Sequence, residues 1–253
     1  MKASFSVVVL AFTGTLLAAP TTIAPPHKFT CTPGVEWAAY RYCDLCSESE
    51  MLHKAGTLDI NHLDLRFLLP LRAPASHGVT SRLFAPQLQS PSTSRSVYGR
   101  ARPTGRNTLV NHRGYLRPSK DGVFRLRVTG AVGDTLVFWH GDKAKGAYSV
   151  ANADYRTNSG AAAARDGWRD DEYRFEVAAG EIVPFRVIWS NGRNGDGLEG
   201  VRILDSDESV VLGAFSLEND QVVTSCSGEG APEGAEPWGR WEVDLRPVFY
   251  PDF

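Results

Sequence analysis

Apolar and polar residues alternate strictly along much of the second half of the chain. Residues 122–130, "GVFRLRVTG", put Phe124, Leu126 and Val128 on one face and Arg125 and Arg127 on the other. A repeat of two is the period of a β-strand, in which successive side chains point to opposite sides of the sheet. The pattern therefore predicts a strand with one buried and one solvent-facing side.

Further strand patterns follow in the same half. Residues 134–141, "DTLVFWHG", contain a continuous apolar run, which is typical of a strand buried on both faces. Residues 172–192 alternate, turn at Ala179-Gly180 and alternate back, which predicts a hairpin. Residues 200–215 repeat this arrangement around the turn sequence "DSDES".

Helical signals are weak, so we expect an all-β fold. The main exceptions are a short helix at residues 47–56, with Ser47 as N-cap and Glu50 three residues on, and an alanine run in "SGAAAARDGW". Many strands separated by Gly- and Pro-rich turns indicate an antiparallel β-sandwich or barrel. Residues 31–80 have a mixed pattern, and we expect them to form an irregular N-terminal extension.

The N-terminus, "MKASFSVVVLAFTGTLLAAP", has the features of a secretory signal peptide. Lys2 precedes an apolar stretch, residues 5–17, which is too short for a membrane anchor, and Ala18-Ala19 supply small residues near a cleavage point. We predict a signal peptide at residues 1–19, a Pro/Thr-rich lead-in at 20–30 and a single domain at 31–253. The protein is then secreted.

Secretion determines how the cysteines are interpreted. All four, Cys31, Cys43, Cys46 and Cys226, lie beyond the signal peptide, and an even number in an oxidising compartment predicts two disulfides. Three pairings are possible. The distance in sequence between Cys46 and Cys226 favours at least one bridge from the N-terminal to the C-terminal segment. A redox or zinc role for "CDLC" lacks the surrounding pattern that it requires.

Charge and composition exclude some classes of partner. The chain of 253 residues has 27 Lys and Arg against 29 Asp and Glu, a net charge of −2. Such a balance gives no overall attraction to nucleic acid or to anionic membranes. A polar stretch at residues 84–107 carries four arginines, and we expect a solvated surface loop, with contact to an anionic glycan as the alternative.

No familiar catalytic motif occurs in the chain, and we expect a protein that is not an enzyme. Sequences such as GxSxG, HExxH and the P-loop are absent, and no pair of carboxylates has a spacing that indicates glycoside hydrolysis. Two loops carry candidate ligands instead: residues 131–139, with Asp134, and residues 190–200, "SNGRNGDGLEG". Carboxylate, amide and backbone oxygens are the ligands of Ca²⁺, although such a loop also serves as a plain connection between strands.

Three segments in this order resemble the GLEYA/PA14-type adhesin domains of fungi, relatives of the flocculins. They are "HRGYLRPSKDGVFRLRVTGAVGDTLVFWHGDKA", "AAGEIVPFRVIWSNG" and "GAFSLENDQVVTSC", and "GVEWAAY" at residues 34–40 is similar to the motif that gives the GLEYA group its name. The resemblance implies a PA14-like β-sandwich that binds glycans through Ca²⁺. We expect Glu36 in "GVEWAAY" to meet a buried partner such as an arginine, with Trp37 and Tyr40 packed onto the sandwich.

The resemblance also assigns a site. Asp134 matches the second of two metal-binding aspartates and Asn191 the asparagine, while Arg193 and Gly195 lie where loop carbonyls would complete the metal shell. Residues 193–196, including Asn194 and Asp196, would face the sugar. The first aspartate is replaced by Gly133, so we expect weak calcium binding or none, unless Asp196 compensates.

The predicted function is therefore a secreted, carbohydrate-binding module, outside the cell or associated with the cell wall. The alternative is a PA14-like scaffold with a degenerate calcium site that binds a protein or the matrix, and a glycan hydrolase comes third. Trp168, in a polar loop, is the aromatic residue expected to stack on a sugar, whereas Trp139, Tyr148 and Trp189 are expected in the core. The C-terminal sequence contains no apolar anchor, which indicates release rather than tethering.

Overall fold

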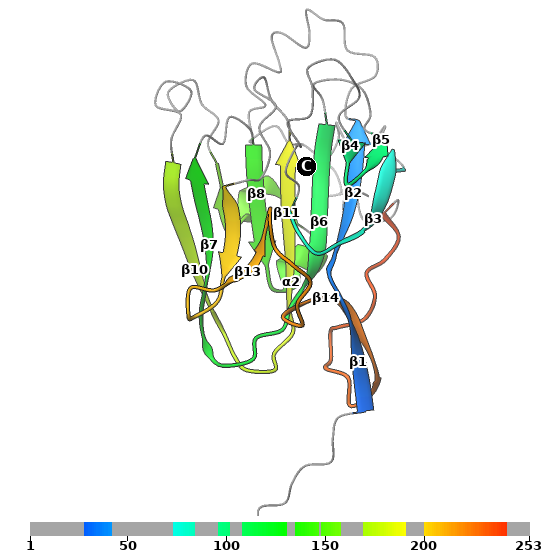
Figure 1. The fold of residues 1–253 in the computed structure, drawn as a ribbon, viewed down its shortest axis with the longest axis vertical. Helices are drawn as coiled ribbons and strands as arrows, with labels where there is room; N and C mark the ends of the chain where they lie inside the picture. The colour runs from blue at the N-terminus through cyan, green and yellow to red at the C-terminus, as the bar shows by residue number, and fades with distance from the viewer. Residues whose placement is uncertain are drawn as a thin grey trace, which may run out of the picture.

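The computed structural model describes residues 28–41, 73–83, 96–101, 108–130, 135–146, 148–157, 169–190 and 200–241. These residues form two main antiparallel sheets that pack face to face (Figure 1). The predicted all-β sandwich is confirmed. Within the described part, no helix has the length and apolar character needed to cross a membrane.

The larger sheet has eight strands. Its main order is β1 (Lys28–Pro33), β14 (Val222–Glu229), β6 (Thr108–Leu116), β11 (Val183–Ser190), β8 (Thr135–His140) and β9 (Tyr155–Arg156). Strand β2 (Val35–Arg41) also pairs with β6 and carries β3 (Ser76–Thr80) on its other side. The N-terminal segment, expected to be irregular, is thus built into the sheet at residues 28–41.

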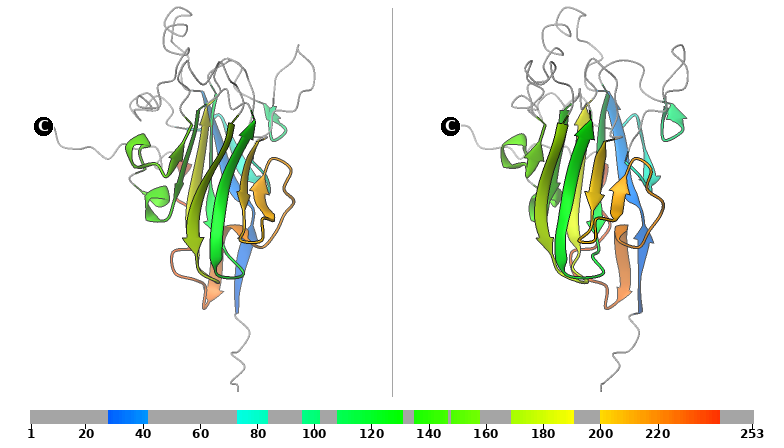
Figure 2. Two further views of the ribbon diagram at one scale, coloured as in Figure 1. Left: turned by 90° about the vertical axis from the view of Figure 1, so that its left-hand side faces the viewer. Right: turned by 60° about the vertical axis from the view of Figure 1, so that its left-hand side comes forward.

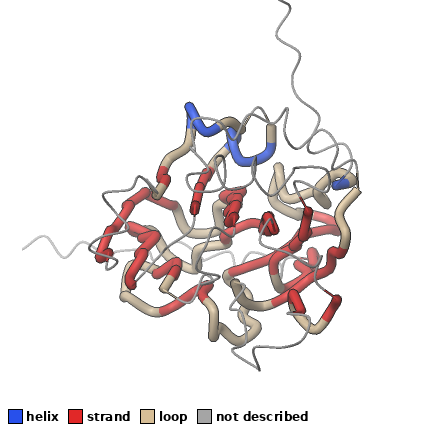
Figure 3. Tube along the Cα trace, turned by 90° about the horizontal axis from the view of Figure 1, so that it is seen from above, coloured by secondary structure: helices blue, strands red, loops and turns tan. Residues whose placement is uncertain are grey.

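The smaller sheet has four strands, in the order β10 (Arg169–Val177), β7 (Gly122–Gly130), β12 (Val201–Leu204) and β13 (Val210–Gly213). It forms the near layer in Figure 2. The strands β4 (Ser96–Val97) and β5 (Arg100–Ala101) pair in a separate hairpin, so part of the expected surface loop is structured. Helix α2 (Asp142–Lys145) and the 3-10 helix η3 (Val150–Asn152) are short and lie outside the strands (Figure 3).

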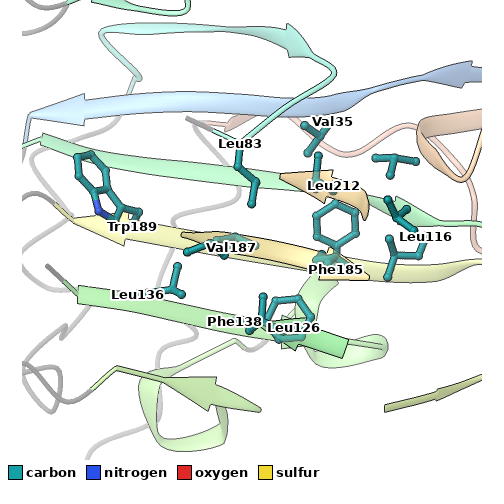
Figure 4. Packing of buried hydrophobic residues seen from close by; sticks show 14 of the residues in the cluster. Val35, Leu83, Leu116, Leu126, Leu136, Phe138, Phe185, Val187, Trp189 and Leu212 are labelled. Carbon is teal, nitrogen blue, oxygen red and sulfur yellow. The ribbon is translucent and has the colours of Figure 1, made fainter. Parts of the chain in front are cut away.

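The main core lies between the two sheets. Phe124, Leu126 and Val128 of β7 point into it and are buried, as their alternation predicts. Strand β11 contributes alternate residues from the opposite layer (Figure 4). The residues of this core from β2, β6, β8, β11, β13 and the segment after β3 include Val35, Leu83, Leu116, Leu136, Phe138, Phe185, Val187, Trp189 and Leu212.

The outer face of the eight-stranded sheet is also covered. Arg113 and Arg186 are buried there under aromatic residues of the C-terminal segment and of the region after α2. The guanidinium carbon of Arg113 lies 3.5 Å from the centroid of the Trp241 ring, and an Arg113 nitrogen lies 2.8 Å from Oε2 of Glu36. Glu36 therefore has a buried arginine as partner, and Trp37 and Tyr40 are buried, as predicted.

The predicted hairpin at residues 172–192 is wrong. Strand β10 pairs with β7 in the smaller sheet, whereas β11 pairs with β6 and β8 in the larger one. The chain crosses between the layers at Ala179-Gly180, and the Gly180 amide donates to the Pro118 carbonyl over 2.9 Å. Alternation indicates which side of each strand is buried and carries no information on which strand is its neighbour.

One disulfide joins the two ends of the domain. Cys31 of β1 and Cys226 of β14 are register partners and form a disulfide across 195 residues of sequence. The expected bridge from the N-terminal to the C-terminal segment is confirmed. Cys43 and Cys46 lie outside the described residues, and a second bridge remains a prediction.

Removal of this disulfide should destabilise the domain strongly. We expect the double variant Cys31→Ser/Cys226→Ser to lose about 4 kcal/mol of unfolding free energy, because closing so long a loop restricts the unfolded chain. Urea denaturation followed by tryptophan fluorescence measures the loss. Ser227→Ala, an exposed change on the same strand, is the control. A loss below about 1 kcal/mol in the double variant would contradict the expectation.

A buried histidine should make stability depend on pH. Tyr98 donates its hydroxyl proton to the Arg82 carbonyl (2.8 Å), so His112 Nε2, 2.7 Å away, carries the proton between them. Burial lowers the pKa of His112 from 6.5 to about 3, against a smaller opposing effect of a hydrogen bond with the Val187 backbone. The unfolded chain therefore binds a proton below pH 6.5 that the folded protein does not take up until about pH 3.

The unfolding free energy should consequently fall as the pH drops from 6.5 towards 3, by up to about 1.4 kcal/mol per pH unit from this group. His112→Gln should flatten this decline. His77→Gln, which changes an exposed histidine on β3, should leave it unaltered. Urea denaturation at a series of pH values measures the slope, and equal slopes for wild type and His112→Gln would refute the assignment.

Candidate functional site

The residues that the sequence assigns to binding all lie between described strands. Residues 131–134 include Gly133 and Asp134, and residues 158–168 end at Trp168. Residues 191–199 include Asn191, Arg193, Asn194, Gly195 and Asp196. These side chains are outside the described part of the chain. The strands on either side of them are described, and they determine where each connection begins and ends.

Strand pairing joins the residues that adjoin Asp134 and Asn191 in the sequence. Asp134 directly precedes Thr135, the first residue of β8, and Asn191 directly follows Ser190, the last residue of β11. Thr135 and Ser190 are register partners. Opposite residues of antiparallel strands have their Cα atoms about 4.5–5.5 Å apart. Two expected ligands, distant in sequence, therefore adjoin a single cross-strand pair.

Gly200, the first described residue after 191–199, lies against the end of β7. Gly200 accepts hydrogen bonds from the Thr129 amide (2.8 Å) and hydroxyl (3.3 Å). Thr129 is the last residue but one of β7, which ends at Gly130. A Cβ atom on Gly200 would lie 1.6 Å from the Thr129 carbonyl oxygen. Only glycine allows this approach of the two backbones.

The third connection, which ends at Trp168, begins and ends in the same region. Arg169, the residue after Trp168, pairs with Gly130 in the smaller sheet. At its start, Thr157 donates its amide to the Leu136 carbonyl, and the Thr157 hydroxyl accepts from the Leu136 amide, each over 2.9 Å. All three connections thus leave from one end of the sandwich, towards which β7 and β11 run in Figure 1.

Beneath this end the packing is tight. Trp189 and Leu136 are buried and lie opposite each other in adjacent strands, one residue below the Thr135–Ser190 pair. Trp139 and Tyr148 are also buried, and the Trp139 indole donates to the Ser149 carbonyl and to Asn152. These three aromatic residues belong to the core, as expected, and are not available to stack on a sugar.

The described residues at this end contribute few charged groups. Asp171 of β10 accepts a hydrogen bond of 3.1 Å from the Tyr155 hydroxyl. No three His, Cys, Asp or Glu side chains in the described ranges gather so that they could hold a metal ion. The ligands of any metal at this end must therefore include the oxygens of the connecting residues.

A second polar cluster lies beside β8 and β10, around Asp154. This carboxylate accepts from His140 Nδ1 over 2.8 Å and forms an ion pair with Lys143, and Tyr173 donates to it over 3.3 Å. Burial raises the pKa of Asp154, but the hydrogen bonds from Lys143 and His140 outweigh it and hold the pKa below its ordinary value. The cluster is an anchor between α2, β8, β10 and the segment after η3.

Sequence patterns missed the residues that hold the loops in place. Gly200 ends the segment "GLEG", which the sequence marks only as a turn, and Thr129 is an outward-facing position of a half-buried strand. Their contact depends on β7 and β12 being neighbours. The alternation within each strand does not contain that information.

Substitution of Gly200 should disturb this end of the fold. We expect Gly200→Ala to break the Thr129–Gly200 hydrogen bonds and to lower the unfolding free energy by about 2–3 kcal/mol, because the added methyl group overlaps a backbone carbonyl. Gly146→Ala is the control, since no atom lies within 4 Å of a Cβ placed there. Thermal denaturation compares the two variants, and equal stability would contradict the close approach.

Comparison with known proteins agrees with the β-sandwich fold. Residues 108–205 match the GLEYA domain family. No curated protein matches the chain. The A domain of Epithelial Adhesin 9 from Candida glabrata is similar in structure, with 12% identity, a TM-score of 0.51 and coverage of 81% of this chain and 93% of that domain; it was solved in complex with Galb1-3GlcNAc.

A second structure of the same adhesin domain, in complex with Galb1-4GlcNAc, has a TM-score of 0.52 at 12% identity and the same coverage. The PA14 sugar-binding domain of an RTX adhesin has a TM-score of 0.43 at 14% identity, over 71% of this chain and 93% of that one. The match of residues 108–205 to the GLEYA domain family agrees with the resemblance inferred from the sequence.

Proposed function

We propose that the protein is a carbohydrate-binding, adhesin-like module that takes up glycans at the end of the sandwich where β7 and β11 terminate. The observation that supports this proposal is the pairing of Thr135 with Ser190, the residues that adjoin Asp134 and Asn191 in the sequence. The similar adhesin domain from Candida glabrata was solved with galactose-containing disaccharides, which supports the same class of ligand.

Calcium is part of the proposal. Asp134 and Asn191 would supply side-chain oxygens and Arg193 and Gly195 backbone carbonyls, the hard oxygen ligands that Ca²⁺ prefers. A bound Ca²⁺ offers coordination positions to sugar hydroxyls. Gly133 removes one carboxylate from the set that the family resemblance implies, so the affinity for the ion is expected to be low unless Asp196 joins the set.

The remaining assigned residues would contact the sugar. Asn194 and Asp196 offer hydrogen-bonding groups beside the metal ligands. Trp168 directly precedes Arg169, whose partner Gly130 ends the strand that leads to Asp134. An indole at that position would stack on the apolar face of a pyranose ring. We propose no chemical step at this end, since binding alone accounts for these groups.

An extracellular location accompanies this function. The Cys31–Cys226 disulfide suits an oxidising compartment, and the apolar segment at residues 5–17 suits secretion. A cell-wall association would follow from the glycan ligand itself. A second candidate function, binding of a protein or of the matrix without calcium, is favoured by Gly133.

A glycan array tests the proposal. The folded protein should bind β-linked galactosyl-GlcNAc disaccharides in Ca²⁺, and EDTA should remove the signal. Asp134→Ala and Asn191→Ala should each weaken binding at least about tenfold, as loss of a charged or metal-bound ligand group does. Asp207→Ala is the matched control, because this exposed carboxylate pairs with Lys120 near the start of β7.

The outcomes separate the hypotheses. Absence of glycan signal from protein with wild-type stability would reject carbohydrate binding and favour the protein- or matrix-binding alternative. Binding that persists in EDTA and in Asp134→Ala would reject the calcium site while keeping the glycan. Turnover of an arrayed glycan would overturn both. Calorimetric titration of Ca²⁺ into wild type and Asp134→Ala gives an independent measurement of the metal site.

A further inference from the structure

The outer face of the four-stranded sheet carries a concentration of arginine side chains. Phe124, Leu126 and Val128 of β7 point into the core, and the residues between them therefore point outward. The outward positions of β7, β10 and β12 include Arg125, Arg127, Arg174 and Arg202. We call these four residues the arginine face.

Strand register arranges these side chains in rows. Arg127 of β7 lies opposite Glu172 of β10 on one side and opposite Arg202 of β12 on the other. Arg125 and Arg174 are opposite each other in the next row. Neighbouring strands are about 4.8 Å apart, and alternate residues of a strand are about 6.8 Å apart. The backbone positions that carry the four arginines are therefore regularly spaced.

Two carboxylates compensate part of this charge. Glu172 accepts from Arg174 over 2.6 Å and from Arg127 over 3.0 Å, and the hydrogen bond from Arg174 is the main cause that holds its pKa below the ordinary value. Arg125 pairs with Glu208 over 2.7 Å. Three of the four guanidinium groups thus share two carboxylates, although the chain as a whole has a net charge of −2.

Arg202 is the residue that this network leaves out. The described residues contain no ion pair to it, its side chain is exposed, and its stem lies along β13, where a Cβ on Gly213 would come 3.4 Å from Arg202 Cγ. It stands directly across from Arg127. Like charges in opposite positions of a sheet repel and destabilise it. An anion placed between the two guanidinium groups would turn this repulsion into attraction.

We propose that the arginine face is a second binding surface, which takes an acidic polysaccharide that bears sulfate, phosphate or carboxylate groups. Guanidinium groups bind such groups through paired hydrogen bonds, and a flat sheet with cations at regular spacing suits an extended charged polymer. The polymer crosses β7 and β12. Asp170 and Glu176, near the two ends of β10, disfavour a path along that edge strand.

The same face lacks the groups that favour nucleic acid. Proteins that hold single-stranded nucleic acid stack its bases on aromatic side chains. The outward positions of the described β7, β10 and β12 are filled by Val, Thr, Arg, Asp and Glu, and their aromatic residues point inward. The arginine face consists of residues within β7, β10 and β12 and includes none of the residues assigned to the lectin site, so this inference does not depend on that site.

Dextran sulfate, with uncharged dextran as reference, serves as the probe. The wild-type protein should bind immobilised dextran sulfate at low ionic strength, and this binding should weaken as salt is added. It should not bind uncharged dextran. Arg202→Gln should reduce the affinity by about tenfold, as loss of a charge-assisted hydrogen bond does. Arg240→Gln removes the same charge from an exposed position on the C-terminal segment and should change the affinity little.

Failure to bind dextran sulfate, equal binding of uncharged dextran, or equal losses in Arg202→Gln and Arg240→Gln would each overturn the proposal. Binding of single-stranded oligo(dT) as tight as that of dextran sulfate, and lost in Arg202→Gln, would assign the face to nucleic acid instead. Asp134→Ala should leave dextran sulfate binding intact, which keeps this test separate from that of the lectin site.

Discussion

Strand β11 is the element on which the arrangement of the molecule depends, because it is paired on both edges and buried on both faces. Its hydrogen bonds to β6 and β8 set the register of three adjacent strands. Phe185, Val187 and Trp189 fill the core between the sheets, while Arg186 and Ile188 lie under the outer cover. A shift of one residue would exchange these two sets, moving an arginine into the main core, so the register is strongly specified. The same register places Ser190 opposite Thr135, and the geometry of the candidate loop site follows from it.

Two arginines are buried on the outer face of the eight-stranded sheet, beneath the C-terminal segment and the region after α2. Arg186 donates to the Ala144 carbonyl over 2.9 Å and to Asn111 over 3.1 Å, and its guanidinium carbon lies 4.0 Å from the centroid of the Tyr148 ring. Arg113 is held in the same way by Glu36, the Gly239 carbonyl and Trp241. Polar atoms buried without partners would cost about 1–3 kcal/mol each, so these contacts fix the C-terminal segment in place on the sheet. Residues 34–40 and 231–241, far apart in sequence, are thereby tied to one another.

Sequence patterns correctly predicted which face of a strand is buried, where one face lies in the core and the other is outside it. In β7 the alternation of Phe124 and Leu126 with Arg125 identifies the buried side, and the turn at Gly180, with φ of 73°, follows from the preference of glycine for that conformation. The pairing of β10 and β11 was misjudged because a short turn between alternating segments has the same pattern whether it joins neighbours or crosses between layers. The Gly200–Thr129 contact was missed for a related reason. The sequence marks Asp134 and Asn191 as candidate ligands, whereas the pairing of their neighbours Thr135 and Ser190 depends on a register that only the assembled sheet defines.

The proposed arginine face follows from one property of a sandwich. Only every second residue of a strand packs into the core, so the residues between them are available for binding. On β7 the inward set is constrained by packing, whereas Arg125 and Arg127 lie on the outer face and pair with carboxylates there. In these proposals the charged face would attract a polymer at long range, and the loop end would select among sugar hydroxyls at short range. If both act on the same glycan-rich surface, the second contact occurs at high effective concentration once the first has formed, and modest affinities at each site combine into firm attachment.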